Sequence, residues 1–199
     1  IRNYIRMDVE SAGFEATYEE TEYRVSLIIK DTEGNAVYYC VPLGTLAYKL
    51  QAMTEDPNRT GVKVEGLEPV QGPDEGKDEG YERLFDGRLG TKLCTLDYSP
   101  IIFKTQEAVT IDSYSLVTAN DNELYGGRIP SGGWKLLGST TGEDDTWVEL
   151  DERVNSDISS VADFTEYNFK IAAEKQGAYQ FYKIEIDSTS LYQFSEVLL

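Results

Sequence analysis

The alternation of apolar and polar residues with a period of two is the feature that most constrains this chain. In residues 23–31, YRVSLIIKD, the side chains of Val25, Leu27 and Ile29 fall on one face of an extended chain, and polar side chains fall on the other. The same spacing recurs along most of the sequence, whereas a helical spacing of apolar residues is almost absent. Alternation of this kind indicates half-buried strands, so we predict an all-β protein.

The first 58 residues contain three such segments. Residues 4–10 (YIRMDVE) and 36–43 (AVYYCVPL) alternate in the same way as residues 23–31, and Glu33-Gly34-Asn35 reads as a hairpin turn between the last two. One short helix is predicted over residues 43–53, where Leu46, Leu50 and Met53 have helical spacing. We therefore expect residues 1–58 to form a small β-rich unit, whose function the sequence does not indicate.

Residues 67–80 are rich in proline, glycine and acidic residues, so we interpret them as a linker or long loop. Strand signals then return every ten to fifteen residues up to the end of the chain. They lie at 101–105, 109–119, 133–139, 146–153, 167–173, 178–187 and 192–199. Many short strands separated by turn residues are typical of an antiparallel sandwich or barrel, which we place in residues 59–199.

Composition narrows the classes of partner. With 36 acidic and 18 basic residues among 199, the net charge is −18, which repels nucleic acids and anionic membrane surfaces and mildly favours a monomer. The chain is 40% hydrophobic and 12% aromatic, which is enough to bury a core. No apolar run approaches the roughly 18 residues that span a bilayer, so membrane insertion is not expected. The chain begins with Ile1 and shows no signal-peptide pattern, so we interpret it as a mature or trimmed fragment.

The chain contains no histidine, which excludes a Ser-His-Asp triad, a Cys-His dyad and any histidine-ligated metal centre within it. The two cysteines, Cys40 and Cys94, lack the spacing of a zinc site. They can form a disulfide or remain as two buried thiols.

The order of motifs in the second part resembles the discoidin family, also called the coagulation factor type C domain. The motifs are GYERLFDGRLGTKLC at 80–94, the long stretch 100–139, TWVELDERVN at 146–155, AYQFYKIEI at 178–186 and YQFSEVLL at 192–199. The resemblance covers residues 60–199 and implies a galactose-binding-like β-sandwich, similar to bacterial carbohydrate-binding modules attached to secreted glycosidases and surface proteins. Two positions depart from the family: Leu93 replaces a tryptophan, and the stretch from Arg128 to Trp134 is one residue longer.

The resemblance also implies a structural calcium ion, held between the first loop of the domain and a glutamate on the last strand. On the matching positions, the ligands are the side chains of Asp86 and Glu196, the oxygens of Thr91, and the carbonyls of Leu84, Arg88 and Ser195. Hard cations such as calcium take about six to eight oxygen ligands of these kinds. Arg88 stands where the family often has a second aspartate, and it supplies a carbonyl only. The alternative is a plain turn with a capping aspartate and an exposed glutamate.

The segment 119–133, ANDNELYGGRIPSGG, is the best candidate for ligand contact because it is long, polar and rich in glycine. Sugars bind to aromatic faces and to planar polar groups, and the segment provides both types of side chain. The candidates are Asn120, Asp121, Asn122, Tyr125 and Arg128. The alternative is an ordinary surface turn in which Arg128 pairs with a carboxylate to hold the loop. Trp134 and Trp147 lie within strand patterns and are predicted to be core residues.

These observations predict a noncatalytic recognition module that acts outside the cell or at its surface and binds a glycan. A protein-binding or spacer module of a larger surface protein is the alternative. A hydrolase is disfavoured, because no spacing isolates two carboxylates in an apolar pocket.

Overall fold

The computed structural model describes residues 15–20, 24–30, 36–42, 53–59, 61, 63–74, 79–159 and 162–199. The chain divides into two compact units, Ile1–Leu50 and Gln51–Leu199. On sequence grounds we placed the division between residues 58 and 59, which is a few residues later.

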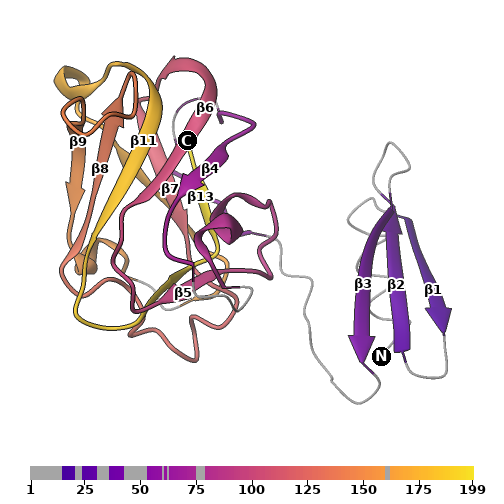
Figure 1. Ribbon diagram of the computed structural model, residues 1–199. Coiled ribbons are helices and arrows are strands. Elements are labelled where there is room, and N and C mark those ends of the chain that lie inside the picture. Colours follow the sequence, from indigo (N-terminus) through magenta and orange to yellow (C-terminus); the bar gives the residue numbers. More distant parts are fainter. Residues whose placement is uncertain are drawn as a thin grey trace. The chain divides into compact units, whose positions relative to one another are not determined.

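The first unit contains an antiparallel three-stranded sheet in the order β1-β2-β3 (Figure 1). Its strands are β1 (Glu15–Glu20), β2 (Arg24–Lys30) and β3 (Ala36–Pro42). In the antiparallel β2–β3 register Leu27 lies opposite Tyr39. The predicted antiparallel pair is therefore confirmed. The predicted strand at 4–10, the turn at 33–35 and nearly all of the predicted helix, residues 43–52, lie outside the described residues.

The second unit is an antiparallel β-sandwich, which confirms the predicted fold class. One layer is a five-stranded sheet in the order β4-β6-β11-β8-β9, and the other is a three-stranded sheet in the order β10-β7-β13, with a two-stranded β12-β5 ribbon at one end (Figure 1). The strands are β4 (Glu68–Gln71), β5 (Leu93–Thr95), β6 (Ile101–Thr110), β7 (Ser113–Val117), β8 (Gly133–Ser139), β9 (Val148–Arg153), β10 (Glu166–Lys170), β11 (Ala178–Asp187), β12 (Tyr192–Phe194) and β13 (Glu196–Leu198). Three short 3₁₀ helices connect them: η1 (Tyr81–Phe85), η2 (Asn155–Asp157) and η3 (Ala173–Lys175).

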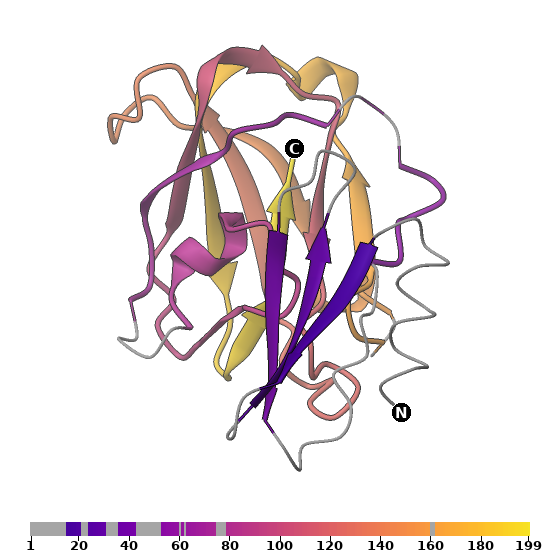
Figure 2. The same cartoon turned by 90° about the vertical axis from the view of Figure 1, so that its right-hand side faces the viewer.

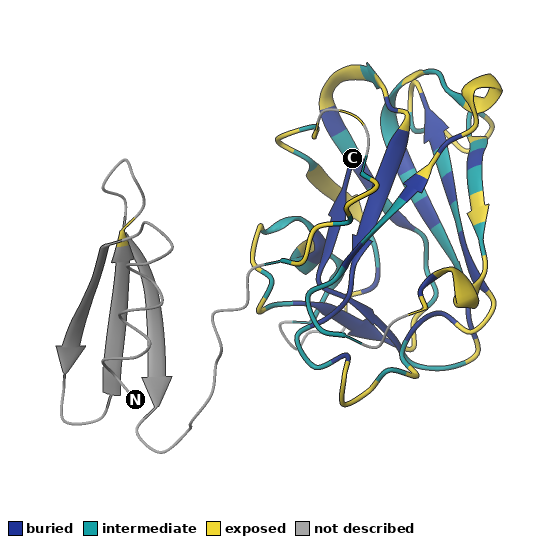
Figure 3. Ribbon diagram, turned by 180° about the vertical axis from the view of Figure 1, so that it is seen from behind, coloured by how far each residue is buried: buried dark blue, intermediate teal, exposed yellow. Residues whose placement is uncertain are grey.

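The core lies between the two sheets and is built from the alternating residues of both (Figure 3). Trp134 on β8 is 1% exposed and packs edge-on against Phe169 of β10, while Phe103 and Tyr182 stack between β6 and β11. Phe169 of β10 and Tyr182 and Ile184 of β11 are all buried in this core. Large aromatic side chains of this kind supply most of the apolar area that stabilises such a sandwich.

A bulge interrupts the regular alternation of β9. In the β8–β9 register Leu136 pairs with Asp151 and Leu137 pairs with Glu149, so Leu150 is the extra residue on β9. Leu150 is 1% exposed and belongs to the core cluster, and the Asp151 side chain is only 13% exposed. Two successive residues of β9 are therefore turned inward, which an unbroken strand does not allow.

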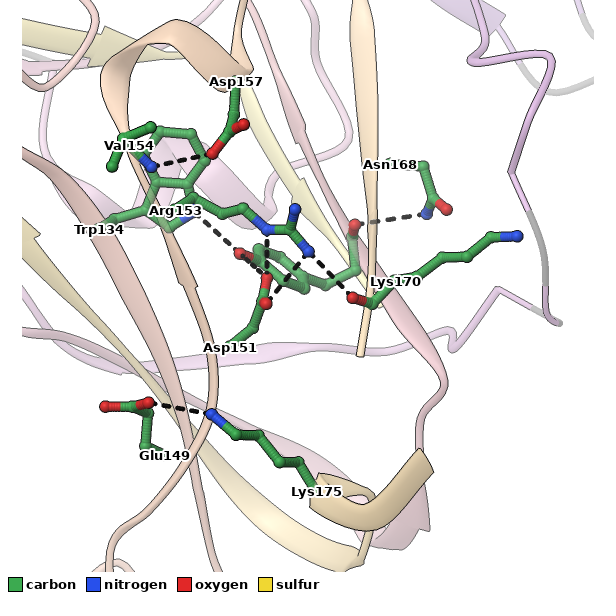
Figure 4. Close-up of polar contacts among 10 residues, drawn as sticks. Trp134, Glu149, Asp151, Arg153, Val154, Asp157, Asn168, Lys170 and Lys175 are labelled. Carbon is green, nitrogen blue, oxygen red and sulfur yellow. Dashed lines mark hydrogen bonds and ion pairs between the residues drawn. The ribbon is translucent and has the colours of Figure 1, made fainter. Parts of the chain in front are cut away.

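Asp151 belongs to a polar network that connects the two sheets (Figure 4). Trp134 Nε1 donates to the hydroxyl of Tyr114 at 2.9 Å, and that hydroxyl donates to Asp151 Oδ2 at 3.0 Å. Arg153 donates to both oxygens of Asp151, at 2.7 and 3.1 Å. Burial, and then the charge of Asp151, raise the pKa of Tyr114 well above its ordinary value, so the phenol remains a donor.

Three local predictions can be compared with the structure. The interpretation of 67–80 as linker or loop is wrong for Glu68–Gln71, which form the edge strand β4. All four side chains are exposed, so no alternation of apolar and polar residues marked this strand.

Trp134 is a core residue as predicted, but Trp147 is only half-buried and precedes β9. Lys183 Nζ lies over the Trp147 ring, 4.8 Å from its centroid. Cys94 is a buried free thiol.

The outer face of the three-stranded sheet is covered rather than solvated. Ser115, Val117 and Glu196 alternate with core residues and so point away from the core, yet they are all buried. Residues 53–59, which we call the strap, lie along β10, where Thr54 forms an isolated parallel bridge with Thr165. On the other side, η1 contacts β13 (Figure 2). These two coverings create the buried polar positions from which the candidate site is built. None of the helices among the described residues is long or apolar enough to cross a lipid bilayer.

Candidate functional site

Two buried carboxylates flank the last residue of β7. Val117 is the register partner of Glu166 on β10 and of Glu196 on β13, so the two glutamates lie in one row of the sheet on opposite sides of the same residue. Glu166 is 2% exposed and Glu196 is 5% exposed. A buried carboxylate needs a compensating charge or hydrogen bonds, and the protein provides these very differently in the two places.

The carboxylate of Glu166 is fully partnered by the strap and by β7. Oε1 lies 3.0 Å from Arg59 NH1 and accepts a hydrogen bond from Ser115 Oγ at 2.6 Å, and Oε2 accepts from the backbone N–H of Asp56 at 3.3 Å. The Glu166 side chain has no exposed area. This carboxylate has its cation and its donors within the chain.

The carboxylate of Glu196 lacks these partners. Its Oε1 is buried and has no hydrogen-bond partner among the described residues. Burial, and then the neighbouring charge of Asp86, raise the pKa of Glu196 to about 8, although the backbone N–H groups of Arg88 and Gly87 and the charge of Lys63 act in the opposite direction. The structure thus brings Asp86 and Glu196, 110 residues apart in sequence, close together, and within the described part of the chain no buried cation neutralises the pair.

The loop after η1 places several oxygens around Asp86. Thr91 Oγ1 lies 2.9 and 2.8 Å from the two carboxylate oxygens of Asp86 and 2.8 Å from the carbonyl of Arg88. The backbone N–H of Arg88 also donates to Asp86 Oδ1 at 2.9 Å. Gly87 has a φ of +69°, a left-handed conformation that a glycine adopts without strain and that folds the loop back on itself.

The remaining predicted metal ligands belong to the same neighbourhood. Leu84 lies in η1, immediately before the loop, and Ser195 precedes Glu196 and donates through Oγ to the carbonyl of Leu89 at 3.1 Å. Among the described residues, no group of three or more acidic or cysteine side chains comes together to hold a metal ion. A cation here must therefore combine two carboxylates with carbonyl and hydroxyl oxygens, as calcium does. The unpartnered oxygen of Glu196 fits such an ion, whereas Arg83, 3.4 Å from Asp86 Oδ2, supplies a partly exposed alternative charge.

The predicted ligand loop carries a hydrogen-bonded cluster of four charged and polar side chains. Asp121 Oδ2 lies 2.6 Å from Lys92 Nζ, and Asp121 Oδ1 accepts from Gln193 Nε2 at 3.0 Å. Gln193 Oε1 accepts from Arg128 NH1 at 3.2 Å and from Lys92 Nζ at 3.3 Å. Arg128 NH1 also lies 3.9 Å from Asp121 Oδ2, so each member contacts at least two others. Lys92 and Gln193 are buried, whereas Asp121 and Arg128 are partly exposed.

An aromatic side chain borders this cluster. The guanidinium carbon of Arg128 lies 3.8 Å from the centroid of the Tyr125 ring, a stacked cation–π arrangement. Tyr125 is 42% exposed and the neighbouring Leu124 is 73% exposed. The loop therefore presents an aromatic face, an aliphatic side chain and an oriented guanidinium to solvent at one place.

The two asparagines of the loop are placed differently. Asn120 Nδ2 donates to the carbonyl of Gly90 at 3.1 Å, which connects the ligand loop with the loop around Asp86. Asn122 is 0% exposed, and neither of its amide atoms has a hydrogen-bond partner among the residues that the structure describes. Of the five residues predicted for ligand contact, Asp121, Tyr125 and Arg128 come together at the surface, and Asn122 lies beneath them.

Sequence reasoning missed Lys92 and Gln193. Lys92 follows Thr91 directly, and Gln193 lies two residues before Ser195, so both adjoin predicted metal ligands. Neither stood out in its strand pattern, because a single polar residue between apolar ones is what alternation predicts for any strand. Their roles appear only once β12 and β5 pair, with Gln193 opposite Cys94.

Comparison with known proteins identifies the fold. No protein-family model and no curated protein matches the sequence. Among solved structures, the F5/8 type C domain of a Bacteroides fragilis protein matches with a TM-score of 0.52 and 15% identity, over 69% of this chain and 93% of the other. The family 32 carbohydrate-binding module of Streptococcus pneumoniae EndoD gives 0.51 and 13%, over 69% and 97%.

A third match is a family 32 module, CBM32-3, from a family 31 glycoside hydrolase of Clostridium perfringens, with a TM-score of 0.51 and 14% identity, over 66% of this chain and 88% of the other. The sandwich thus has the galactose-binding-like fold of discoidin-type domains and carbohydrate-binding modules, which confirms the resemblance found in the sequence.

Proposed function

We propose that the sandwich is a noncatalytic glycan-binding module whose binding site is the cluster of Lys92, Asp121, Arg128 and Gln193 with Tyr125 at its border. The observation that carries this proposal is that the buried Lys92 and Gln193 hold the partly exposed Asp121 and Arg128 of the loop together beside Tyr125. Carbohydrate-binding modules of the same fold support the ligand class.

The chemistry of the cluster suits a sugar. Arg128 presents N–H donors to hydroxyl groups and Asp121 presents a carboxylate that accepts from them, because both side chains are partly exposed. Lys92 and Gln193 are buried and hold these two side chains in place. The exposed part of the Tyr125 ring can pack on the C–H face of a pyranose. Because Arg128 is already held by Tyr125 and Gln193, little side-chain entropy is lost when a ligand binds.

The proposal that the module is noncatalytic rests on the single carboxylate of this cluster. Glycoside hydrolysis ordinarily uses two carboxyl groups placed about 5 to 10 Å apart on either side of the scissile bond. Asp121 is the one acidic side chain in the hydrogen-bonded cluster, and it is already engaged by Lys92 and Gln193.

We also propose that calcium binds between Asp86 and Glu196, with Thr91 and the carbonyls of Leu84, Arg88 and Ser195 completing its shell. The ion would supply the positive charge that Glu166 receives from Arg59 and that Glu196 lacks. Two contacts connect this anchored loop to the binding cluster: Asn120 Nδ2 donates to the carbonyl of Gly90, and Lys92 pairs with Asp121. In this role the ion is structural.

The setting that accords with this function is outside the cell or on its surface, as one module of a larger protein. The net charge of −18 does not suit a nucleic-acid partner.

A glycan array, followed by affinity electrophoresis on the polysaccharides retained, tests the proposal. Tyr125→Ala should weaken binding about tenfold, since an aromatic contact of this kind contributes on the order of 1 kcal/mol beyond its buried area. Leu96→Ala, which removes another exposed apolar side chain outside the cluster, is the matched control and should bind normally. If the folded wild-type chain retained no glycan, the proposal would fail and a protein-binding or spacer role would be favoured.

A further inference from the structure

A half-enclosed recess of about 350 Å³ lies at the end of the sandwich away from the proposed glycan cluster. It adjoins Ser113, where β7 begins, whereas the ligand loop follows Val117, where β7 ends. The described residues that line it come from the end of the strap and the segment after it, the β6–β7 turn, the turn after η3 and the residue after β13. They are Arg59, Gly61, Val64, Thr110, Ile111, Asp112, Ser113, Gln176 and Leu199. Small-molecule sites commonly have this size and a mixed lining.

The charges of the recess do not cancel. Arg59 and Asp112 are the ionisable side chains among the described lining residues. The charge of Arg59 is already compensated, because its NH1 lies 3.0 Å from the fully buried carboxylate of Glu166. No cationic side chain among the described residues pairs with Asp112, whose carboxylate accepts a long hydrogen bond of 3.4 Å from Ser113 Oγ. One negative charge therefore remains in the recess.

The backbone on either side of Asp112 is well defined. Gly61 has a φ of +96°, and the Asp112 carboxylate lies where a Cβ on residue 61 would displace it. The backbone carbonyl of Asp112 accepts from the N–H of Ile171 at 2.8 Å, which fixes the turn on its other side. Asp112 is thus a positioned carboxylate at the wall of the recess rather than a side chain on a loose turn.

Neutral acceptors and an apolar surface surround Asp112. Thr110 and Ser113 contribute hydroxyl oxygens, and Gln176 contributes a carboxamide whose Nε2 donates to the carbonyl of Ile171 at 3.0 Å. Ile111 and Leu199, 6% and 4% exposed, form an aliphatic part of the wall together with Val64. An ammonium group has three N–H donors and no acceptor, so it matches one carboxylate with neighbouring neutral oxygens.

We propose that this recess binds a primary ammonium group carried on an aliphatic or ring-shaped body. The ammonium pairs with Asp112, and its carbon skeleton packs on Ile111, Val64 and Leu199. The net charge of −18 favours the approach of such a cation. An amino sugar and a lysine side chain of a partner both have this chemistry. The inference is independent of the proposed glycan cluster.

The test is an amide chemical-shift titration of the full chain with glucosamine and, separately, with Nα-acetyl-lysine methylamide. Glucose and N-acetylglucosamine are the uncharged comparisons. We expect at least one of the amines to shift the amides of Ile111, Ser113 and Gln176 saturably in the millimolar range, while the uncharged sugars leave them unmoved. Binding of glucosamine alone identifies an amino sugar as the ligand, and binding of the lysine derivative alone identifies a side chain.

Asp112→Asn should weaken amine binding about tenfold or more, because it removes a charge-assisted hydrogen bond while keeping the size of the side chain. Glu152→Gln, which removes one negative charge from an exposed position on β9, is the matched control and should bind as the wild type does. If Asp112→Asn alters the melting temperature, Thr110→Val on the exposed end of β6 provides a second variant, expected to weaken binding less. Amides that do not shift with either amine, or shifts that persist unchanged in Asp112→Asn and Thr110→Val, would overturn the proposal.

Discussion

Glu166 and Glu196 lie on either side of Val117 in one sheet, and both are almost completely buried. On the β10 side the strap brings Arg59, and the charge is neutralised within the chain. On the β13 side the loop after η1 brings another acid, Asp86, and one oxygen of Glu196 has no partner among the described residues. The comparison teaches that two equally buried carboxylates can differ completely in how their charge is compensated, and the proposed calcium ion accounts for that difference.

The largest expected effect comes from removing Arg59, the cation that neutralises the buried carboxylate of Glu166. Arg59→Ala should destabilise the sandwich by about 3 kcal/mol or more, because removing one partner of a buried ion pair leaves the other charge unpaired. Urea unfolding followed by tryptophan fluorescence measures this, since both tryptophans belong to the second unit. Lys104→Ala, which breaks the exposed pair with Glu68, should cost less than about 1 kcal/mol. Equal costs for the two variants would contradict the contrast, and adding Glu166→Gln to Arg59→Ala should recover part of the loss.

Calcium should stabilise the sandwich through Asp86 and Glu196, on the β13 side of the sheet, and nowhere else. At a concentration about one hundred times its dissociation constant, an ion that binds only the native state stabilises it by about 2.7 kcal/mol, and a chelator should remove that gain. Differential scanning calorimetry with calcium and with chelator measures the shift. Asp86→Ala should abolish the response, whereas Asp144→Ala, on an exposed loop between β8 and β9, should keep it. A wild-type melting temperature that is the same in calcium and in chelator would remove the ion from this account.

Without a metal ion, the buried carboxyl group of Glu196 should make the free energy of unfolding depend on pH. The folded-state pKa of Glu196 is raised to about 8, so the folded chain keeps a proton that the unfolded chain releases near the ordinary glutamate pKa of 4.5. The stabilisation is complete below the unfolded pKa and is lost as the pH rises toward 8, by up to roughly 1.4 kcal/mol for each pH unit. Unfolding of metal-free protein between pH 5 and pH 8 measures the slope (both limits set by those pKa values). Glu196→Gln should flatten it, and an unchanged slope in that variant would assign it to other groups.

The smallest expected effect concerns the shape of the loop. Gly87→Ala should cost about 1 to 2 kcal/mol through its left-handed backbone, because nothing in the protein lies within 4 Å of the added Cβ. Gly87→Asn should cost less, since asparagine adopts this conformation more readily. Thermal unfolding of the two variants in calcium shows the difference, and a cost for alanine no greater than that for asparagine would show that the φ of +69° does not govern the loop.

The sequence indicated the strands well because their alternation is a local property. It also indicated that Asp86 and Glu196 belong together, but through the resemblance of the motifs and not through any local pattern. Arg59 and Glu166 could not be connected in advance, since their contact depends on the strap lying along β10, and an acid and a base 107 residues apart carry no signal of pairing. The strand β4 was missed for the opposite reason: its four side chains are all exposed, and its place is set by backbone hydrogen bonds to β6.

The bulge on β9 has a consequence for how the two layers are aligned. Because Leu150 and Asp151 both turn inward, two adjacent residues of β9 contribute an apolar core side chain and an acceptor for the Tyr114 hydroxyl. A shift of β9 by one residue would place Glu152 or Leu150 opposite that hydroxyl and would separate the Asp151 carboxylate from its donor. The bulge therefore specifies the register of β9: the hydrogen bonds of this network are satisfied in one register and lost in the registers one residue away.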